Sequence, residues 1–155
     1  KRISQWIGLA LVLVAVAATL GLGQISAWGK ASTHTITFER GDALAPGMDA
    51  RIGAIAARLA SDESLEAVIT GHTGTIGDPQ ANHDLSVNRA RKVRAAIVDT
   101  MRAEGDDALD RIRAFGAGGT EPLEQGEDEA DRAYQRRLAR ATVEISVALP
   151  AADLQ

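Results

Sequence analysis

The stretch GHTGTIGDPQANHDLSVNRARKV, residues 71–93, joins a loop to the start of a regular apolar pattern. Its first part, from Gly71 to His83, is rich in Gly, Pro, Asn and Asp, which favour loops. From about Leu85 to Glu104 apolar residues recur at helical spacing, and Gly105 is a natural stop for a helix. The buried stripe of this helix is predicted to be Ala90, Val93, Ile97 and Met101.

Strands and further helices are predicted on both sides of this stretch. Residues 35–38 and 142–147 alternate polar and apolar side chains, as half-buried strands do, and residues 65–70 suit an interior strand. The other predicted elements are a strand over 112–115, a short helix over 131–138 and a helix with the apolar face Met48, Ile52, Ile55 and Leu59. The resulting βαβαβαβ order, with its short connections, predicts an α/β domain with a sheet covered by helices.

An uncharged segment from Ile7 to Trp28 precedes this domain. As a helix it would span about 33 Å, enough to cross the core of a bilayer. Lys1 and Arg2 come before it, which favours a cytoplasmic N-terminal end. A cleavable signal peptide is the alternative, but its apolar core is only about 7–15 residues long. We therefore expect a single-pass inner-membrane anchor over residues 1–30, a periplasmic domain over 33–149 and a tail over 150–155.

Small residues recur every four positions in the expected anchor, at Ala15, Thr19, Gly23 and Ala27. Such a stripe lets two membrane helices approach closely. It predicts that the anchor packs against a membrane protein partner or against a second copy of the chain. The alternative is that Ala and Gly are simply common in this sequence.

Composition argues against several classes of function. The chain has no cysteine, so these residues form no disulfide, no thiolate metal site and no lipid-modified cysteine. A net charge of -4 argues against nucleic-acid binding, which favours a basic surface. His34, His72 and His83 lack the spacing of helical metal sites, and no nucleophile–base pair is visible. We therefore expect no metal, no cofactor and no enzymatic activity.

The loop and helix carry further side chains at fixed spacings. These are Gly71-His72-Thr73, Gly77 and Asn82-x-x-Leu85-Ser86-x-x-Arg89-Ala90-x-x-Val93, with a later turn Gly116-x-Gly118-x-x-x-Pro122 and a final Val143-Glu144-Ile145. Together they resemble the OmpA C-terminal, peptidoglycan-associating family, whose usual form is G-H-T-D-x-x-G followed by N-x-x-L-S-x-x-R-A-x-x-V. The resemblance spans residues 35–147. It implies an α+β sandwich of the small βαβαβ type, in which helices cover a small mixed sheet. It also implies that the domain grips the diaminopimelate of peptidoglycan stems.

A ligand site in this loop and helix is what the resemblance implies. Diaminopimelate presents an ammonium group and a carboxylate close together. Arg89 would bind the carboxylate with its planar guanidinium, in about the first turn of the helix, where backbone amides also favour an anion. The other ligand-binding residues implied are Asn82, Thr73, Gly74, Leu85 and Ser86.

Two departures from the family pattern affect this site. Gly74 stands where the family has its ammonium-binding Asp, and Arg140-Ala141-Thr142 stands where the family has N-R-R. Losing one partner of a buried charge pair costs about 2–5 kcal/mol, so we expect ligand affinity at least tenfold lower. Asp78 or Asp84 could replace the missing carboxylate. Arg89 could instead cap loop carbonyls or pair with one of these two aspartates.

Two functions therefore stay open. In the first, the domain tethers an inner-membrane assembly to peptidoglycan through Arg89 and the loop over 71–82. In the second, the chain is an accessory subunit of a membrane complex whose domain docks another protein and binds no ligand. The retained Arg89 and Asn82 favour the first function, and Gly74 favours the second.

Overall fold

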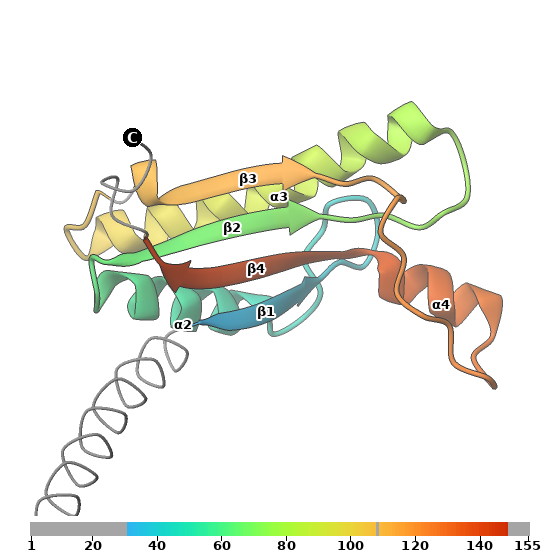
Figure 1. Cartoon of the computed structure of the whole chain (residues 1–155), viewed down its shortest axis with the longest axis horizontal. Coiled ribbons are helices and arrows are strands. Elements are labelled where there is room, and N and C mark those ends of the chain that lie inside the picture. Colours follow the sequence, from blue (N-terminus) through green and yellow to red (C-terminus); the bar gives the residue numbers. More distant parts are fainter. Residues whose placement is uncertain (1–30, 108, 149–155) are drawn as a thin grey trace, which may run out of the picture. The chain divides into compact units, whose positions relative to one another are not determined.

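The computed structural model describes residues 31–107 and 109–148. Their elements, in chain order, are β1 (Ser32–Thr37), α2 (Met48–Ala60), β2 (Leu65–Gly71), α3 (Pro79–Ala103), the 3-10 turn η1 (Leu109–Arg111), β3 (Ile112–Gly116), α4 (Asp131–Leu138) and β4 (Arg140–Val147). This order confirms the predicted βαβαβαβ arrangement (Figure 1).

The predicted anchor over 1–30 lies outside the described residues, and so do its small-residue stripe and the tail over 150–155. Within the part that is described, no helix combines the length and the apolar character needed to cross a membrane.

The four strands form one mixed sheet in the order β1-β4-β2-β3. β4 pairs antiparallel with β1 and with β2, whereas β2 and β3 are parallel. A parallel pair needs a long crossover, and α3 supplies it. The carboxyl ends of β2 and β3 therefore lie side by side, with Gly71 opposite Gly116.

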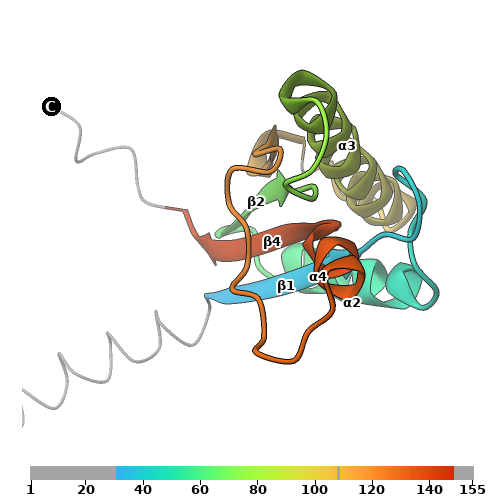
Figure 2. The same cartoon turned by 90° about the vertical axis from the view of Figure 1, so that its right-hand side faces the viewer.

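One apolar core fills the space between the sheet and two helices. Figure 2 shows α2 and α3 on the same face of the sheet, while Figure 1 shows α4 beyond one end of the strands. The predicted stripe of α3 is confirmed as buried, with Ala90, Val93, Ile97 and Met101. That of α2 is confirmed for Ile52, Ile55 and Leu59, whereas Met48 is only partly buried against the core. From the sheet, alternate residues of β2 enter the same core: Leu65, Ala67 and Ile69.

The prediction that the second helix begins near Leu85 is wrong, because α3 begins at Pro79. The carboxylate of Asp78 caps the helix by accepting a hydrogen bond of 2.8 Å from the backbone N–H of Ala81. Proline fits the first helical position, where its missing N–H is not needed. The apolar pattern does not reveal these turns because their side chains are mostly exposed.

α3 lies so close to the ends of β2 and β3 that only glycine fits there. A Cβ atom on Gly71 would overlap the carbonyl of Ser86, and one on Gly116 would overlap the Ser86 hydroxyl and Val87. This close approach fixes the N-terminal half of α3 over the carboxyl end of β2. Arg89 consequently lies beside the residue that follows β2, His72.

Candidate ligand-binding site

A depression of about 350 Å³ lies where the β2–α3 loop meets α4. It is lined by Glu39, Thr73, Gly74, Ile76, Asn82, Leu85, Arg89, Arg132, Gln135, Arg136 and Ala139. We call it the Arg89 depression. The structure thus brings together all the ligand-binding residues that the resemblance implies except Ser86.

Arg89 is held at the bottom of this depression by backbone carbonyls. Its Nε and Nη2 groups donate to the carbonyl of Gly41 at 2.8 and 2.6 Å, and its Nη1 group donates to the carbonyl of His72 at 2.8 Å. Its guanidinium also lies 5.1 Å from the ring centre of Phe38. The side chain therefore does cap loop carbonyls, as one of its two interpretations predicted.

The same side chain keeps some of its capacity for a ligand. Three of the N–H groups of Arg89 donate to carbonyls, whereas a guanidinium carries five. Arg89 lines the depression although it is only 4% exposed. Capping and ligand binding are compatible roles for this arginine.

Arg89 lies about three turns into α3, since the helix begins at Pro79. The expectation that it sits near the first turn is therefore wrong, and the N-terminal amides of the helix do not share its ligand. Burial lowers the pKa of Arg89, and the nearby carboxylate of Asp42 raises it in part. An arginine stays protonated in spite of such a shift, so the depression has a permanent positive charge at its base.

The space beside Gly74, where the family has its aspartate, is occupied by a side chain of α4. A Cβ atom on Gly74 would overlap the side-chain oxygen of Gln135, from α4. Two hydrogen bonds hold that amide in place: its oxygen accepts from the N–H of Thr75 at 3.0 Å, and its nitrogen donates to the Thr75 hydroxyl at 3.1 Å. A neutral amide thus occupies the space next to Gly74.

Neither aspartate proposed as a substitute lines the depression. Asp78 caps α3, and Asp84 accepts a hydrogen bond of 2.9 Å from Gln80. Asn82 lines the depression, and its side-chain amide donates to the carbonyl of Ile76 at 3.1 Å, which ties the loop to the helix.

Ser86 is fully buried and lies outside the depression. Its hydroxyl donates to the carbonyl of His83 at 2.6 Å and accepts from the N–H of Gly118 at 2.9 Å. It therefore connects α3 to the glycine turn after β3, a structural role.

Sequence reasoning missed the part of the depression that α4 contributes. Arg132 and Arg136 are four residues apart, which places them on one face of the helix. Together with Arg40, which lines an adjoining hollow with Glu39 and Arg136, they form no side-chain ion pair or hydrogen bond within the described part of the chain. The spacing of the two α4 arginines was visible in the sequence, but which side of α4 faces the loop was not.

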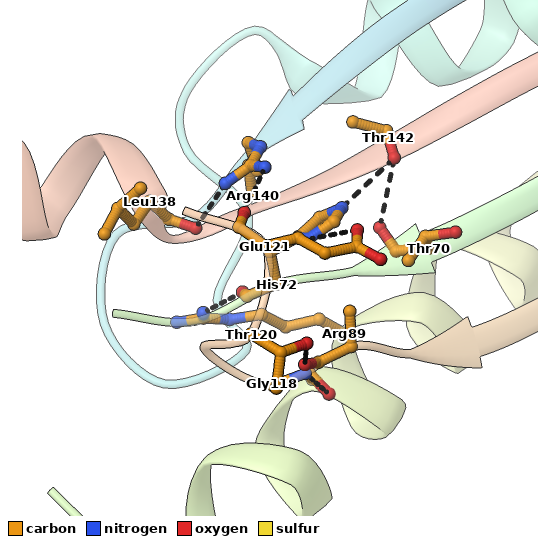
Figure 3. A network of polar contacts seen from close by, with 11 residues as sticks. Thr70, His72, Arg89, Gly118, Thr120, Glu121, Leu138, Arg140 and Thr142 are labelled. Atoms are coloured by element: carbon orange, nitrogen blue, oxygen red, sulfur yellow. Dashed lines mark hydrogen bonds and ion pairs between the residues drawn. The ribbon is translucent and has the colours of Figure 1, made fainter. Parts of the chain in front are cut away.

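A polar network lies beneath the β2–α3 loop (Figure 3). The Nε2 atom of His72 is 3.2 Å from the hydroxyl of Thr142, and its Nδ1 atom is 3.6 Å from a carboxylate oxygen of Glu121. Arg140 donates to the carbonyls of Leu138 and Glu121 at 3.4 and 3.1 Å. Burial and the charge of Arg140 lower the pKa of His72, while Glu121 acts in the opposite direction. In the described residues, no cluster of His, Cys, Asp and Glu side chains could hold a metal.

A second hollow, of about 270 Å³, lies between the β2–α3 loop and the glycine turn. Its lining is mostly glycine, threonine and proline, and it contains no Asp, Glu, Lys or Arg. The Arg89 depression is the better candidate because a buried charged group is part of its lining.

Comparison with known proteins places these features in a family. The sequence profile of the OmpA family matches residues 37–136. The lipoprotein YfiB of Escherichia coli (strain K12) is 28% identical over 113 residues, which cover 72% of this chain and 68% of that protein.

Two solved structures resemble this fold. The peptidoglycan-associated lipoprotein from Burkholderia pseudomallei has a TM-score of 0.60 at 22% identity, over 72% of this chain and 89% of that one. The periplasmic domain of Helicobacter pylori MotB has a TM-score of 0.59 at 17% identity, over 77% of this chain and 78% of that one.

Proposed function

The chain belongs to the OmpA family, and on that premise we propose that it is a cell-envelope protein that binds peptidoglycan through the Arg89 depression. One relative in fold is named for its association with peptidoglycan. We also propose that the domain acts by binding and catalyses no reaction, because its depression presents arginines and amides with no nucleophile–base pair beside them.

The main support for this proposal is the buried guanidinium of Arg89 in the lining of the depression. A buried guanidinium with unused N–H groups is costly unless a partner satisfies them. A carboxylate can accept two hydrogen bonds from one guanidinium, and such charge-assisted pairs are strong. Peptidoglycan stem peptides carry carboxylates, so one of them would complete the coordination of Arg89.

The tethering function is the finer part of the proposal. The segment from Ile7 to Trp28 would hold the domain at the inner membrane, with Ala15, Thr19 and Gly23 against a membrane partner or a second copy. Its run length and its basic flank support this arrangement. A cysteine introduced at Ser32 should react with a reagent confined to the periplasm. Reaction only from the cytoplasmic side would contradict the topology.

A second candidate function is protein docking without a ligand. Gln135 fills the space next to Gly74, and carbonyls already hold Arg89 in place, so the depression is stable when empty. Binding to purified peptidoglycan sacculi distinguishes the two functions.

The experiment is co-sedimentation of the full chain with sacculi, comparing the wild type with Arg89→Ala and Arg94→Ala. Arg94 is the matched control because it also lies on α3 and donates to backbone carbonyls, those of Ile112 and Leu109 at 2.7 and 2.9 Å. It does not line the depression. We expect Arg89→Ala to lose sedimentation and Arg94→Ala to retain it. Wild-type protein that stays in the supernatant would contradict peptidoglycan binding and support docking.

A further inference from the structure

The Arg89 depression is basic although the whole chain is acidic. Three arginines and one glutamate line it, in a chain whose net charge is -4. Arg132 and Arg136 are exposed, and neither is neutralised by a side-chain partner within the described residues. Arg40 adds a further positive charge in the adjoining hollow. This distribution attracts carboxylates and repels a ligand ammonium group.

The group that fills the space beside Gly74 also lacks the negative charge that would balance an ammonium. Gln135 is an amide, which carries no net charge and has both a donor and an acceptor. The two hydrogen bonds to Thr75 use one of the two N–H groups of the Gln135 amide and one lone pair of the Gln135 oxygen. The remaining N–H and lone pair can pair with the C=O and N–H of another amide.

From these two observations we propose that the depression selects a carboxylate ligand whose neighbouring nitrogen is acylated and therefore uncharged. In peptidoglycan this chemistry belongs to a cross-linked stem, in which the side-chain amine of the diamino acid has become an amide. Arg89, Arg132 and Arg136 bind the carboxylates, and Gln135 pairs with the amide. The inference rests on the proposed function and adds the form of the stem that is recognised.

Glu39 is the one carboxylate among the described residues that line the depression. It also lines the adjoining hollow, together with Arg136 and Arg40. Arginines therefore outnumber carboxylates in both places.

The test is calorimetric titration of the full chain with two synthetic stem tripeptides. They end in diaminopimelate with its side-chain amine either free or acetylated. Wild-type protein should bind the acetylated peptide about tenfold more tightly, or about 1.4 kcal/mol. Gly74→Asp should reverse this preference, because a carboxylate would replace the amide at that point. Gly74 is not among the glycines with positive φ, and only the flexible end of Gln135 must move, so the backbone accepts this change.

Asn88→Asp is the matched control. It adds the same charge as Gly74→Asp, but Asn88 is exposed on α3 and does not line the depression. It should leave the preference unchanged. A wild-type preference for the free amine would overturn this inference and leave peptidoglycan binding intact. Failure to bind either peptide, together with no sedimentation on sacculi, would overturn both.

Discussion

Arg89 and Arg111 lie at opposite ends of the sheet and are both surrounded by backbone carbonyls. At the start of β2 and β3, Arg111 donates to the carbonyls of Leu59 and Leu65 at 3.1 and 3.0 Å and to a carboxylate oxygen of Asp106 at 2.9 Å. Arg89, at the carboxyl end of β2, bonds to two carbonyls and, within the described part of the chain, to no carboxylate.

The difference shows how one residue type takes two roles in a small fold. Arg111 has its own counter-ion, so that end of the sheet is electrostatically complete. Within the described residues no carboxylate bonds to Arg89, and Asp42, whose charge raises the pKa of Arg89, lies 3.7 Å from Lys92 instead. The two ends of the sheet therefore differ in whether a carboxylate bonds to the arginine, and the proposed function uses the end where none does.

The largest effect is expected from Arg111→Ala. This change leaves a carboxylate and several carbonyls without their donor, so the free energy of unfolding should fall by about 2–4 kcal/mol. Urea denaturation measures it. Arg113→Ala, in the same region, removes an exposed ion pair with Glu66 and should cost under about 1 kcal/mol. Peptide affinity of the folded fraction should be unchanged in both variants, and a loss in Arg111→Ala would contradict the division into two ends.

A smaller effect, on binding, is expected from Arg132→Ala combined with Arg136→Ala. The two side chains are exposed and have no side-chain partners among the described residues. The free energy of unfolding should therefore change by less than about 0.5 kcal/mol. Affinity for the acetylated peptide should fall about tenfold, because two cations leave the depression.

The control for that variant is Arg91→Ala combined with Arg113→Ala, which removes the same charge outside the depression. Equal losses of affinity in both double variants would mean that total charge matters and the depression does not.

The smallest effect is expected from pH acting on His72. Its pKa is lowered in the folded state by burial and by Arg140, with Glu121 opposing them. The unfolded chain, with a histidine pKa of about 6.5, therefore binds the proton first. The contribution of His72 to the free energy of unfolding should be fully present above about pH 6.5. It should be lost as the pH falls below that value.

Thermal unfolding between about pH 5 and 7.5 measures this slope, and His72→Gln should flatten it. His34→Gln is the comparison, because the pKa of His34 is also lowered, by burial and by Arg58 and Arg51. An unchanged slope in His72→Gln would assign the effect to other groups.

Local patterns in the sequence determined the elements and the core. Apolar residues recur with a period of two in residues 142–147 and with a period of 3.6 in the stripe of α3. Each period reflects which side of the element faces apolar neighbours. For that reason the βαβαβαβ order and the buried helical stripes follow from the residues alone, whereas the mixed sheet was implied by the family resemblance. The motif from Gly71 to Val93 likewise placed Arg89, Asn82, Thr73, Gly74 and Leu85 in one site before any geometry was known.

Only the tertiary structure decided what the site is made of. α4 approaches the β2–α3 loop from about 60 residues further along the chain, and no local period encodes that contact. It brings Gln135 against Gly74 and two arginines to the rim, while Ser86 is buried against the glycine turn. The capping by Asp78, which starts α3 early, moved Arg89 away from the helix end. The charge of the depression depends on side chains that meet in space, and their spacing in the sequence does not record that meeting.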